Sequence, residues 1–600
     1  MQVVILAAGM GKRLKYKTAE HTKSMVSILG KTFLEHSLDK LTQFDISRII
    51  IVIGYCGNEI KQIIGDFYNN IPVIYVENKI YETTNNIYSL SLAKDYLYSE
   101  DTLLLESDLI YDAEIIQKLL QNPYPNLAVV DKYQAYMDGT VVKVNENDEI
   151  TAFVSKEHFD YGEIDKYYKT VNIYKLSQSF LRNQYLPFLD AYCKAIGNNS
   201  YYEQVLKVLL SLEKKDLKVL RLEHEKWYEV DDLQDYDIAE CLFCDGEEKL
   251  AKYAKRYGGY WRFSDLKDFC YLVNPYFPPK RLFEEMKNNF EDLLMNYPSG
   301  QAVQDNLIAN TFDLDEEMVA VGNGAAELIK VLLSEMNGDV GIILPTFQEY
   351  PSRLSKLTKV HYFTPANADF SYTVEDLKNF ARQIDILILI NPDNPSGNFI
   401  TKAQLIELAE FYKMKNKTIV LDESFVDFSE ELEENSLLHK DILKEFPNLI
   451  LIKSISKSYG VPGLRLGIAA SANIPLIKKL KINLPVWNIN SYAEFFMQIL
   501  NKYKDAYRQA CRKISDNRTI FFHQLSKIPF LRPIPSQANY ILCEVLAPYK
   551  ADEICQELLK SDILIKNCQN KMGFNGRQYI RLAVKSKEDN NFLINVLEKL

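Results

Sequence analysis

The chain has 600 residues, of which 47% are hydrophobic and 25% are charged, and its formal net charge is −11. This length is too great for one hydrophobic core, so at least two domains are expected. The acidic balance argues against nucleic acid or an anionic membrane surface as a partner, and no apolar run approaches the roughly 20 residues that span a bilayer.

The first part of the chain alternates short apolar runs with amphipathic stretches. Strands are predicted at Val3–Ala7, Arg48–Ile53, Pro72–Val76, Thr102–Leu105 and Leu127–Val130, and helices at Phe33–Phe44 and Glu59–Tyr68. Strands that alternate with helices indicate βαβ units and a mostly parallel sheet. The start of the chain is therefore interpreted as a first strand rather than a signal peptide, because no basic region precedes its apolar run.

A charged, helix-prone stretch follows at about Phe243 and ends in Gly258-Gly259. We interpret residues 243–261 as a helical connector between a first domain, 1–242, and a second, 262–600. The second domain begins a new α/β series, with strands predicted at Val340–Leu344, Ile384–Ile390, Thr418–Asp422, Leu449–Ser454 and Leu466–Ala470. A smaller α+β part is expected around Tyr540–Glu544 and Tyr579–Val584.

The nine cysteines are an odd and largely unpatterned set. One CxxC string, Cys241-Leu242-Phe243-Cys244, has no second pair or nearby histidine to complete a zinc site, so it is interpreted as chance spacing. Unpatterned cysteines in a large chain indicate reduced thiols and a cytoplasmic location.

A glycine-containing basic loop follows the first predicted strand. Glycines let backbone N–H groups approach phosphates, and Lys12 and Arg13 add positive charge. The stretch resembles the sugar-nucleotidyltransferase superfamily, whose signature LAAGxGxRL is followed by a lysine, and the resemblance extends over about residues 1–240. It implies a Rossmann-like mixed sheet, catalytic roles for Arg13 and Lys23, and nucleotide contacts through Leu6, Ala8, Gly9, Gly11 and Lys12. Lys23 follows Thr22, where the family usually has proline.

Two acidic segments stand out: Glu106-Ser107-Asp108 follows the strand predicted at Thr102–Leu105, and Glu229-Val230-Asp231-Asp232 follows Trp227. Open α/β sheets bind ligands at the carboxyl ends of their strands. The resemblance implies that Asp108 and Asp231 hold a catalytic Mg²⁺, which prefers carboxylate oxygens. The expected reaction is attack by a phosphate-type oxygen on the α-phosphorus of a nucleoside triphosphate, with release of pyrophosphate.

The segment Thr84-Asn85-Asn86-Ile87-Tyr88-Ser89-Leu90 resembles the phosphocholine cytidylyltransferase branch, which implies CTP as the nucleotide. Asn85, Asn86 and Ser89 are expected to read a base edge or ribose, although an asparagine-rich helix cap is an alternative. A trimethylammonium acceptor needs an aromatic cage, whereas a primary amine needs a carboxylate, for which Asp138 and Glu203 are candidates. Lys156 and Lys169 are candidates to hold the acceptor's phosphate or phosphonate.

The second domain carries several independent motifs. Ser454-Ile455-Ser456-Lys457 precedes Gly463-Leu464-Arg465-Leu466-Gly467, and Asn391-Pro392-Asp393-Asn394 and Leu421-Asp422-Glu423 lie upstream. Pyridoxal 5′-phosphate (PLP) needs a lysine for its aldehyde and a polar, cationic cup for its phosphate. Lys457 fits the first role, and Ser454, Ser456 and Arg465 fit the second. Asp422 fits the position beside the PLP ring nitrogen, and Asn394 could hydrogen-bond to the ring hydroxyl. Phe347 could cover one face of the ring, and the backbone amides of Gly324-Ala325-Ala326, at a helix N-terminus, could hold the phosphate.

Over about residues 262–600 these motifs resemble the fold-type I, class I and II aminotransferases, near histidinol-phosphate aminotransferase and threonine-phosphate decarboxylase. The resemblance implies a large α/β part and a small α+β part, a substrate carboxylate on Arg581, and a homodimer in which Tyr297 reaches the neighbouring subunit's PLP. Phe425 stands where the family usually has tyrosine, which removes one hydroxyl near the PLP ring.

The pairing of halves is similar to that of phosphonate cytidylyltransferases fused to 2-aminoethylphosphonate transaminases. That resemblance implies amino transfer from an amino acid to phosphonoacetaldehyde, or the reverse to a keto acid, and cytidylyl transfer from CTP to 2-aminoethylphosphonate. The alternative is a phosphocholine cytidylyltransferase joined to a histidinol-phosphate-type aminotransferase or threonine-phosphate decarboxylase. A catalytically inactive binding module in one half is a further alternative.

Overall fold

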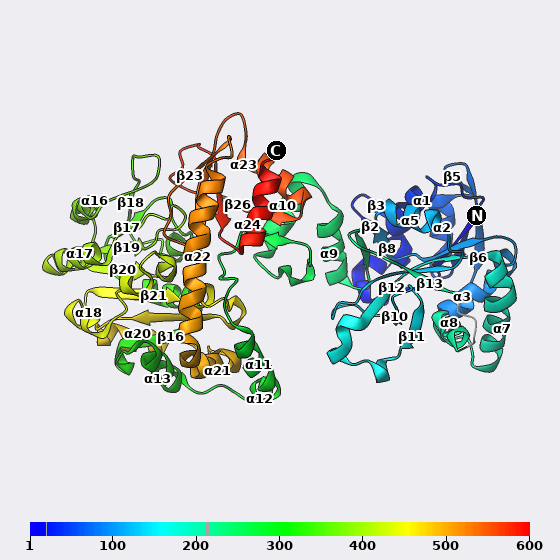
Figure 1. The fold of residues 1–600 in the computed structure, drawn as a ribbon, viewed down its shortest axis with the longest axis horizontal. Coiled ribbons are helices and arrows are strands. Elements are labelled where there is room, and N and C mark those ends of the chain that lie inside the picture. Colours follow the sequence, from blue (N-terminus) through cyan, green and yellow to red (C-terminus); the bar gives the residue numbers. More distant parts are fainter. Residues whose placement is uncertain (20, 212–215) are drawn as a thin grey trace. The chain divides into compact units, whose positions relative to one another are not determined.

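The computed structural model describes residues 1–19, 21–211 and 216–600 and divides the chain into two compact units, Met1–Tyr257 and Gly258–Leu600 (Figure 1). The division falls inside the predicted connector 243–261. Within that stretch, helix α10 (Gly246–Arg256) belongs to the first unit and ends at Tyr257, whose φ of 53° is left-handed. No helix in the described residues is long and apolar enough to cross a membrane.

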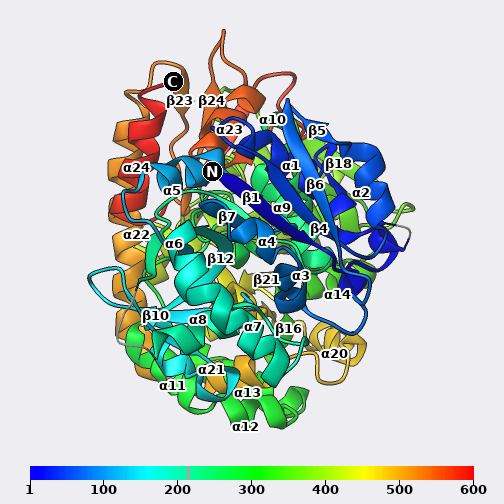
Figure 2. The same ribbon diagram turned by 90° about the vertical axis from the view of Figure 1, so that its right-hand side faces the viewer.

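The first unit is built on a mixed sheet. The main strand order is β11 (Ile150–Val154), β10 (Val141–Val144), β12 (Tyr167–Leu176), β7 (Thr102–Glu106), β1 (Gln2–Ala7), β4 (Ile49–Ile53), β6 (Ile71–Glu77) and β5 (Phe67–Tyr68). Off this order, β9 (Leu127–Lys132) pairs with both β12 and β13 (Lys218–Arg221). Strands β7, β1, β4 and β6 are parallel, while β12 is antiparallel to β7. Figure 2 shows β1, β4 and β6 side by side.

Helices cover both faces of this sheet because both sets of alternating strand side chains are apolar. Val4 and Ile50 belong to one buried cluster, and Val3 and Ile49 belong to another on the opposite face. The helices are α1 (Phe33–Leu41), α2 (Gly57–Ile64), α3 (Asn86–Leu92), α4 (Lys94–Leu97), α5 (Ala113–Gln121), α6 (Gln178–Phe180), α7 (Leu186–Ala195), α8 (Glu203–Leu210) and α9 (Leu233–Phe243). The result is a three-layered α/β unit.

Several predictions differ from the observed elements of this unit, and one is the helix predicted at Phe33–Phe44, which ends at Leu41. The helix predicted at Glu59–Tyr68 ends at Ile64, because Gly65 adopts a φ of 74°. The residues beyond it form β5 (Phe67–Tyr68), which pairs antiparallel with β6. The mixed sheet implied by the resemblance is confirmed, whereas the pattern of apolar runs predicted a mostly parallel sheet and did not include the ten-residue antiparallel strand β12. A separate two-stranded antiparallel sheet, β8 (Leu109–Tyr111) with β14 (Trp227–Glu229), brings two distant acidic segments together.

The second unit has a seven-stranded sheet among its described residues, in the order β16 (Val319–Asn323), β22 (Leu466–Ala470), β21 (Leu449–Ser454), β20 (Thr418–Asp422), β19 (Ile386–Ile390), β17 (Val340–Ile343), β18 (Val360–Phe363). Strand β22 is antiparallel to both neighbours, and the other pairs are parallel. The five strands predicted in this region are confirmed, with shifts of one or two residues at some ends. Fold-type I architecture is confirmed for this unit.

A smaller α+β part completes the second unit. Its antiparallel sheet runs β23 (Leu531–Pro533), β24 (Tyr540–Val545), β27 (Tyr579–Ala583), β26 (Lys566–Asn567), and β15 (Lys267–Asp268) pairs with β25 (Ile563–Leu564). The unit's helices are α11 (Lys280–Asn288), α12 (Phe290–Met295), α13 (Gln301–Phe312), α14 (Ala325–Ser334), α15 (Glu349–Arg353), α16 (Val374–Phe380), α17 (Lys402–Met414), α18 (Lys440–Glu445), α19 (Ile455–Ser458), α20 (Ile474–Asn483), α21 (Ser491–Ile499), α22 (Lys504–Leu525), α23 (Ala551–Lys560) and α24 (Lys587–Leu597).

Strand register explains where the sequence motifs meet. In the first unit Leu6 pairs with Glu106, so the glycine loop and the first acidic segment leave the sheet side by side. In the second unit Ile390 pairs with Asp422 and Asp422 with Ile452. The segments that follow these three strands therefore converge at one edge, where open α/β sheets bind ligands.

Candidate active sites

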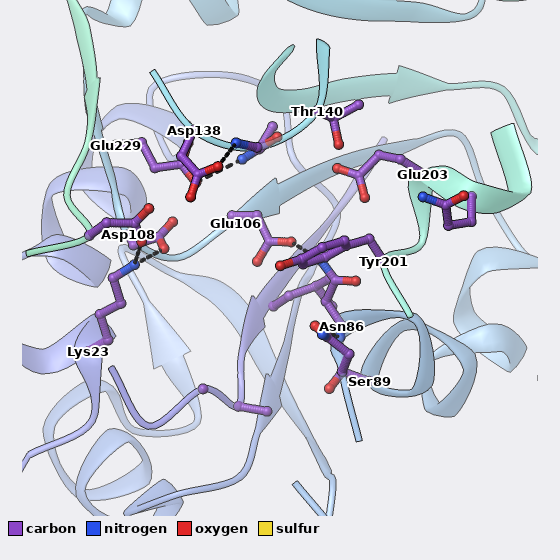
Figure 3. A pocket seen from close by; sticks show the side chains of 18 of the residues that line it. Lys23, Asn86, Ser89, Glu106, Asp108, Asp138, Thr140, Tyr201, Glu203 and Glu229 are labelled. Atoms are coloured by element: carbon purple, nitrogen blue, oxygen red, sulfur yellow. Dashed lines mark hydrogen bonds and ion pairs between the residues drawn. The ribbon is translucent and has the colours of Figure 1, made fainter. Parts of the chain in front are cut away.

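A pocket of about 620 Å³ opens beside the carboxyl ends of β1 and β7 in the first unit. It receives side chains from the loop after β1, the first turn of α3, the end of β14, and segments 138–141, 153–156 and 201–207. Figure 3 shows side chains from several of these segments pointing into one space. The predicted nucleotide-loop residues Leu6, Ala8, Gly9, Gly11, Lys12 and Arg13 all line it.

Lys23 lies at the centre of a charged cluster on one wall of this pocket. Its Nζ donates to Asp108 and, at 2.8 Å, to Oδ1 of Asp231, which also lies 2.8 Å from an Nη of Arg13. Burial alone would lower the pKa of Lys23, but the two carboxylates outweigh it and hold that pKa above its usual value. Burial would raise the pKa of Asp231, yet Lys23 and Arg13 lower it. Lys23 and Asp231 are therefore charged at neutral pH.

The same wall has the donor set for a divalent cation. Carboxylate oxygens of Asp108, Glu229 and Asp231 lie within 4.8 Å of one another. Oδ1 of Asp108 is buried, and no described group hydrogen-bonds to it. Three convergent carboxylates, one with a free oxygen, fit Mg²⁺, which takes hard oxygen ligands. The structure thus brings the predicted pair together and adds Glu229, which belongs to the second acidic motif but was given no role from sequence.

Asn85, Asn86 and Ser89 also line the pocket, but their side chains are engaged in protein hydrogen bonds. Oδ1 of Asn85 caps α3 by accepting from the Asn86 backbone at 2.8 Å. Asn86 donates to Glu106 and accepts from the Tyr202 backbone, both at 3.0 Å. Ser89 Oγ accepts from Asn78 at 3.1 Å. The predicted base-reading residues therefore hold the pocket wall in place, and Asn85 plays the helix-cap role that the sequence left open.

The predicted acceptor-binding residues separate into two groups. Lys156 and Asp138 line the pocket, and the Asp138 carboxylate lies 3.9 Å from Arg13. Lys169 is 1% exposed, and its Nζ pairs with Glu229 at 3.0 Å and donates to the Thr170 carbonyl at 2.6 Å. The structure therefore places Lys169 behind the carboxylate cluster, where it balances Glu229 rather than facing the acceptor.

Two further glutamates lie in the pocket. Glu106 ends β7, and burial with repulsion from Asp108 and Glu203 raises the pKa of its carboxyl well above the usual value. Glu203 begins α8, and burial raises the pKa of its carboxyl to about 7. The sequence named Glu203 only as one of two carboxylates for an amine, and it gave Glu106 no role. A glutamate at the end of a buried strand is the signal that could have identified Glu106.

In the second unit, Lys457 lies on the short helix α19, directly after β21. Its Nζ lies 4.4 Å from the ring centre of Phe425 and 5.3 Å from that of Phe347. Burial lowers the pKa of Lys457 to about 8, Asp422 opposes this shift, and Arg581 and Arg465 add to it. A buried lysine with a lowered pKa is partly neutral at physiological pH, which suits attack on an aldehyde.

Asp422 and Asn394 are fixed by their neighbours at the same sheet edge. Oδ2 of Asp422 accepts from the Tyr350 hydroxyl at 2.8 Å, and Oδ1 accepts from the Ser424 backbone at 2.9 Å. Oδ1 of Asn394 accepts from Arg581 at 2.8 Å. Tyr350 was not identified from the sequence, and its hydroxyl holds the aspartate in a region where Phe425 supplies none. Arg581 lies on β27, so this residue, expected at a substrate carboxylate, and Asn394, expected at the PLP ring, are positioned together.

The phosphate end of the site is a backbone cradle. Gly324 precedes α14, with Ala325 and Ala326 in its first turn, and Arg465 stands against it with a left-handed φ of 58°. A Cβ on Gly324 would lie 2.7 Å from an Nη of Arg465. Ser456 Oγ accepts from the Leu466 backbone at 3.0 Å and so ties Lys457 to this loop, while Ser454 is buried at the end of β21. A helix N-terminus beside an arginine suits a phosphate, so these residues fit PLP.

Replacing Gly324 by alanine is expected to weaken PLP binding by about 10-fold or more. Gly324 has φ 74° and ψ 163°, a conformation that is almost restricted to glycine and costs about 1–3 kcal/mol for other residues, and the added methyl group would displace Arg465. The dissociation constant can be measured by titrating the apoprotein with PLP and following its absorbance. Gly463→Ala is the matched control, because a Cβ there meets nothing within 4 Å. Equal affinities in the two variants would contradict the prediction.

Tyr297 lies outside the PLP pocket of its own chain. It is 79% exposed, and its ring stacks on Trp487 with 4.4 Å between centroids. Exposed apolar side chains occur nearby on α11 and α12, at Phe283, Phe290, Leu294 and Met295. This exposure leaves Tyr297 available to a second subunit.

Comparisons with known proteins match both units. A family described as Aminotransferase class I and II matches residues 274–597, and one described as MobA-like NTP transferase domain matches residues 3–182. The CMP-5'-(3-aminopropyl)phosphonate synthase of Streptomyces rubellomurinus is 30% identical, over 100% of this chain and 95% of that protein. An L-serine phosphate decarboxylase of Campylobacter jejuni is 32% identical over 54% of this chain and 86% of its own length.

A solved structure also matches the second unit. The histidinol-phosphate aminotransferase from Clostridium acetobutylicum has a TM-score of 0.51 and 27% identity, covering 56% of this chain and 98% of that one. The matches to both units make the chain an enzyme that combines a nucleotidyltransferase domain with an aminotransferase-class domain.

Proposed function

Because the chain belongs to the class I and II aminotransferase family and carries an NTP transferase domain ahead of it, we propose that it makes CMP-2-aminoethylphosphonate in two steps. The PLP-dependent unit would exchange an amino group between an amino acid and phosphonoacetaldehyde. The first unit would transfer a cytidylyl group from CTP to the resulting 2-aminoethylphosphonate. The observation that carries the proposal is the full-length similarity to a protein named CMP-5'-(3-aminopropyl)phosphonate synthase, whose named product is also an aminoalkylphosphonate joined to CMP.

The nucleotidyl step would use the charged wall of the first pocket. A phosphonate oxygen forms a bond to the α-phosphorus of CTP, and the bond to the β-phosphate breaks and releases pyrophosphate. Lys23 and Arg13 lie where they can stabilise negative charge on the reacting phosphates. Asp108, Asp231 and Glu229 would hold Mg²⁺, which would supply further charge neutralisation.

The amino-transfer step would use residues of the second unit. PLP, when bound, supplies an electron sink for electrons released at the amino carbon. Lys457 would exchange a proton at that carbon, Asp422 would keep the ring nitrogen protonated, and Arg581 would orient a substrate carboxylate through its planar fork. The Tyr350 hydroxyl fixes Asp422 for this role.

A second candidate reaction for this unit is decarboxylation of a phosphorylated or phosphonylated amino acid. Its support is the 32% identity to an L-serine phosphate decarboxylase. In that reaction the bond to the α-carboxylate breaks, carbon dioxide leaves, and a proton replaces it to yield the same kind of aminoalkyl product. Carbon dioxide release from O-phosphoserine or its phosphonate analogue, without keto-acid formation, would identify decarboxylation; pyruvate formed from alanine and phosphonoacetaldehyde would identify amino transfer.

The decisive test of the nucleotidyl step is pyrophosphate release with CTP and Mg²⁺. The acceptors to compare are 2-aminoethylphosphonate, 3-aminopropylphosphonate, phosphoethanolamine and phosphocholine. The proposal expects the highest kcat/KM with 2-aminoethylphosphonate and none without Mg²⁺. A preference for phosphocholine would replace the phosphonate proposal with a phosphocholine cytidylyltransferase.

The second unit is also proposed to form a homodimer, through the exposed apolar side chains of α11 and α12 near Tyr297. The expected molar mass is twice the 69.5 kDa of one chain, and light scattering with size-exclusion chromatography measures it. A monomer at micromolar concentration would contradict this assignment and the role of Tyr297 at a neighbouring subunit's PLP.

A further inference from the structure

Two carboxylates in the first pocket are not used by the metal site or the cationic wall. Glu203 is the first residue of α8 and is 5% exposed, and Glu106 is the last residue of β7. Both line the pocket, and Figure 3 shows the two carboxylates and the Tyr201 ring facing the same part of it. Oε2 of Glu203 is buried and forms no hydrogen bond with any described residue. A buried carboxylate oxygen without a partner is costly, so it calls for a ligand.

The fold holds these two side chains in a fixed relation. Asn86 donates to Oε1 of Glu106 and accepts from the Tyr202 backbone, so one amide joins the end of β7 to the start of α8. A second tie comes from the Asn85 backbone, which donates to the Asn198 carbonyl at 3.0 Å. These two hydrogen bonds join residues more than 100 positions apart in the chain, and they hold the start of α8 beside the end of β7.

Among the described residues, the protein places no cation at ion-pair distance from either carboxylate, although Lys207 also lines the pocket. Lys169 is the cation that acts on Glu203, but its Nζ is committed to Glu229 at 3.0 Å. Within the described residues, no ion pair is formed by Glu106 or Glu203. Burial raises the pKa of Glu203 to about 7, as expected for a carboxylate that lacks a positive partner. A bound cation with N–H donors would supply both the missing charge and the missing hydrogen bond.

We propose that Glu203 and Glu106, with the ring of Tyr201, bind the primary ammonium group of the acceptor. This inference rests on the proposed nucleotidyl transfer and names the chemical class of its acceptor. A primary ammonium has three N–H donors for the carboxylate oxygens, and its charge is attracted to an aromatic face. A trimethylammonium group has no N–H donor and leaves Oε2 of Glu203 unsatisfied. The site therefore selects primary amines over choline-like groups.

Steady-state pyrophosphate release by the full chain with CTP and Mg²⁺ tests this inference. The probes are 2-aminoethylphosphonate and ethylphosphonate, which differ only in the amine. The wild-type protein should prefer the amine by at least about 10-fold in kcat/KM, because hydrogen bonds to charged groups contribute about 1.5–3 kcal/mol. Glu203→Gln should abolish most of that preference by lowering kcat/KM for the amine alone. Glu146→Gln, at an exposed position outside the pocket, should retain the wild-type preference.

The outcomes separate this inference from the function it rests on. Equal kcat/KM of the wild-type protein for the two probes would overturn the ammonium site while leaving nucleotidyl transfer intact, and this measurement needs no variant. An equal loss with both probes in Glu203→Gln would overturn it as well. A changed preference between CTP and UTP in that variant would instead assign Glu203 to the nucleotide base. If none of the acceptors supported release of pyrophosphate from CTP, the result would contradict the proposed nucleotidyl transfer itself.

Discussion

Replacing Lys457 by alanine is expected to reduce the PLP-dependent reaction by at least about 1,000-fold. The lysine is the amine that lies between the Phe347 and Phe425 rings, and its lowered pKa keeps part of it neutral at pH 7. Alanine leaves no group to bind the PLP aldehyde or to move a proton at the amino carbon. The measurements are the visible absorbance of bound PLP after dialysis and the rate of keto-acid or carbon dioxide formation.

The effect should be confined to the second unit. Because the chain forms two compact units, pyrophosphate release by the first unit should stay within about twofold of wild type. Lys415→Ala, an exposed residue after α17, is the matched control and should retain both activities and the absorbance. If Lys457→Ala kept more than a tenth of the PLP-dependent rate, another residue would have to carry this chemistry.

Asp108→Asn is expected to lower Mg²⁺-dependent pyrophosphate release by at least about 1,000-fold, because metal and charge-stabilising groups each contribute several kcal/mol to the transition state. The amide keeps the shape of the side chain but removes its negative charge. It thereby removes a proposed metal ligand and a partner of Lys23. Chelation of Mg²⁺ in the wild-type protein should produce a loss of the same order.

A loss of folding must be distinguished from this loss of catalysis. Lys23 keeps its 2.8 Å contact with Asp231 in the variant, so the unit should remain folded with a modest decrease in melting temperature. Asp45→Asn, at an exposed position, provides the control for the substitution itself. Full activity of Asp108→Asn at saturating Mg²⁺ would remove Asp108 from the metal site.

Strong local signals allowed much of the fold to be predicted, together with candidate residues for both sites. The apolar runs at Val3–Ala7 and Thr418–Asp422 are buried strands. Lys457, Asp422 and Arg465 come together as their motifs predicted. These residues follow strands of parallel sheets, and the carboxyl ends of neighbouring parallel strands meet at one edge. The motif spacing therefore carries information about position as well as chemistry.

The structure differs from the sequence expectations where the position of a residue depends on contacts with distant segments rather than on its neighbours in the chain. A helix predicted through Tyr68 ended early because one backbone position, Gly65, takes a left-handed conformation. Lys169 was expected at the acceptor, yet its place on β12 beside Glu229 buries it in an ion pair. Asn86, which was expected to read the nucleotide, lines the pocket and also joins Glu106 to α8 through hydrogen bonds that the sequence did not indicate. The type of a polar residue indicates what its side chain can bind, but not which group from a distant segment contacts it in the folded chain.

The sequence by itself determined the two α/β units, the basic glycine loop, the acidic residues after β7 and β14, and the lysine and aspartate of the PLP site. These features depend on strand periodicity and on motifs in which neighbouring residues act together. Only the tertiary structure decided that Glu229 lies beside the carboxylates of Asp108 and Asp231, that Tyr350 holds Asp422, and that Oε2 of Glu203 is buried without a hydrogen-bond partner among the described residues. Those contacts link segments up to about 120 residues apart, and the strand order and register that bring them together are set by packing of the whole unit rather than by any local pattern.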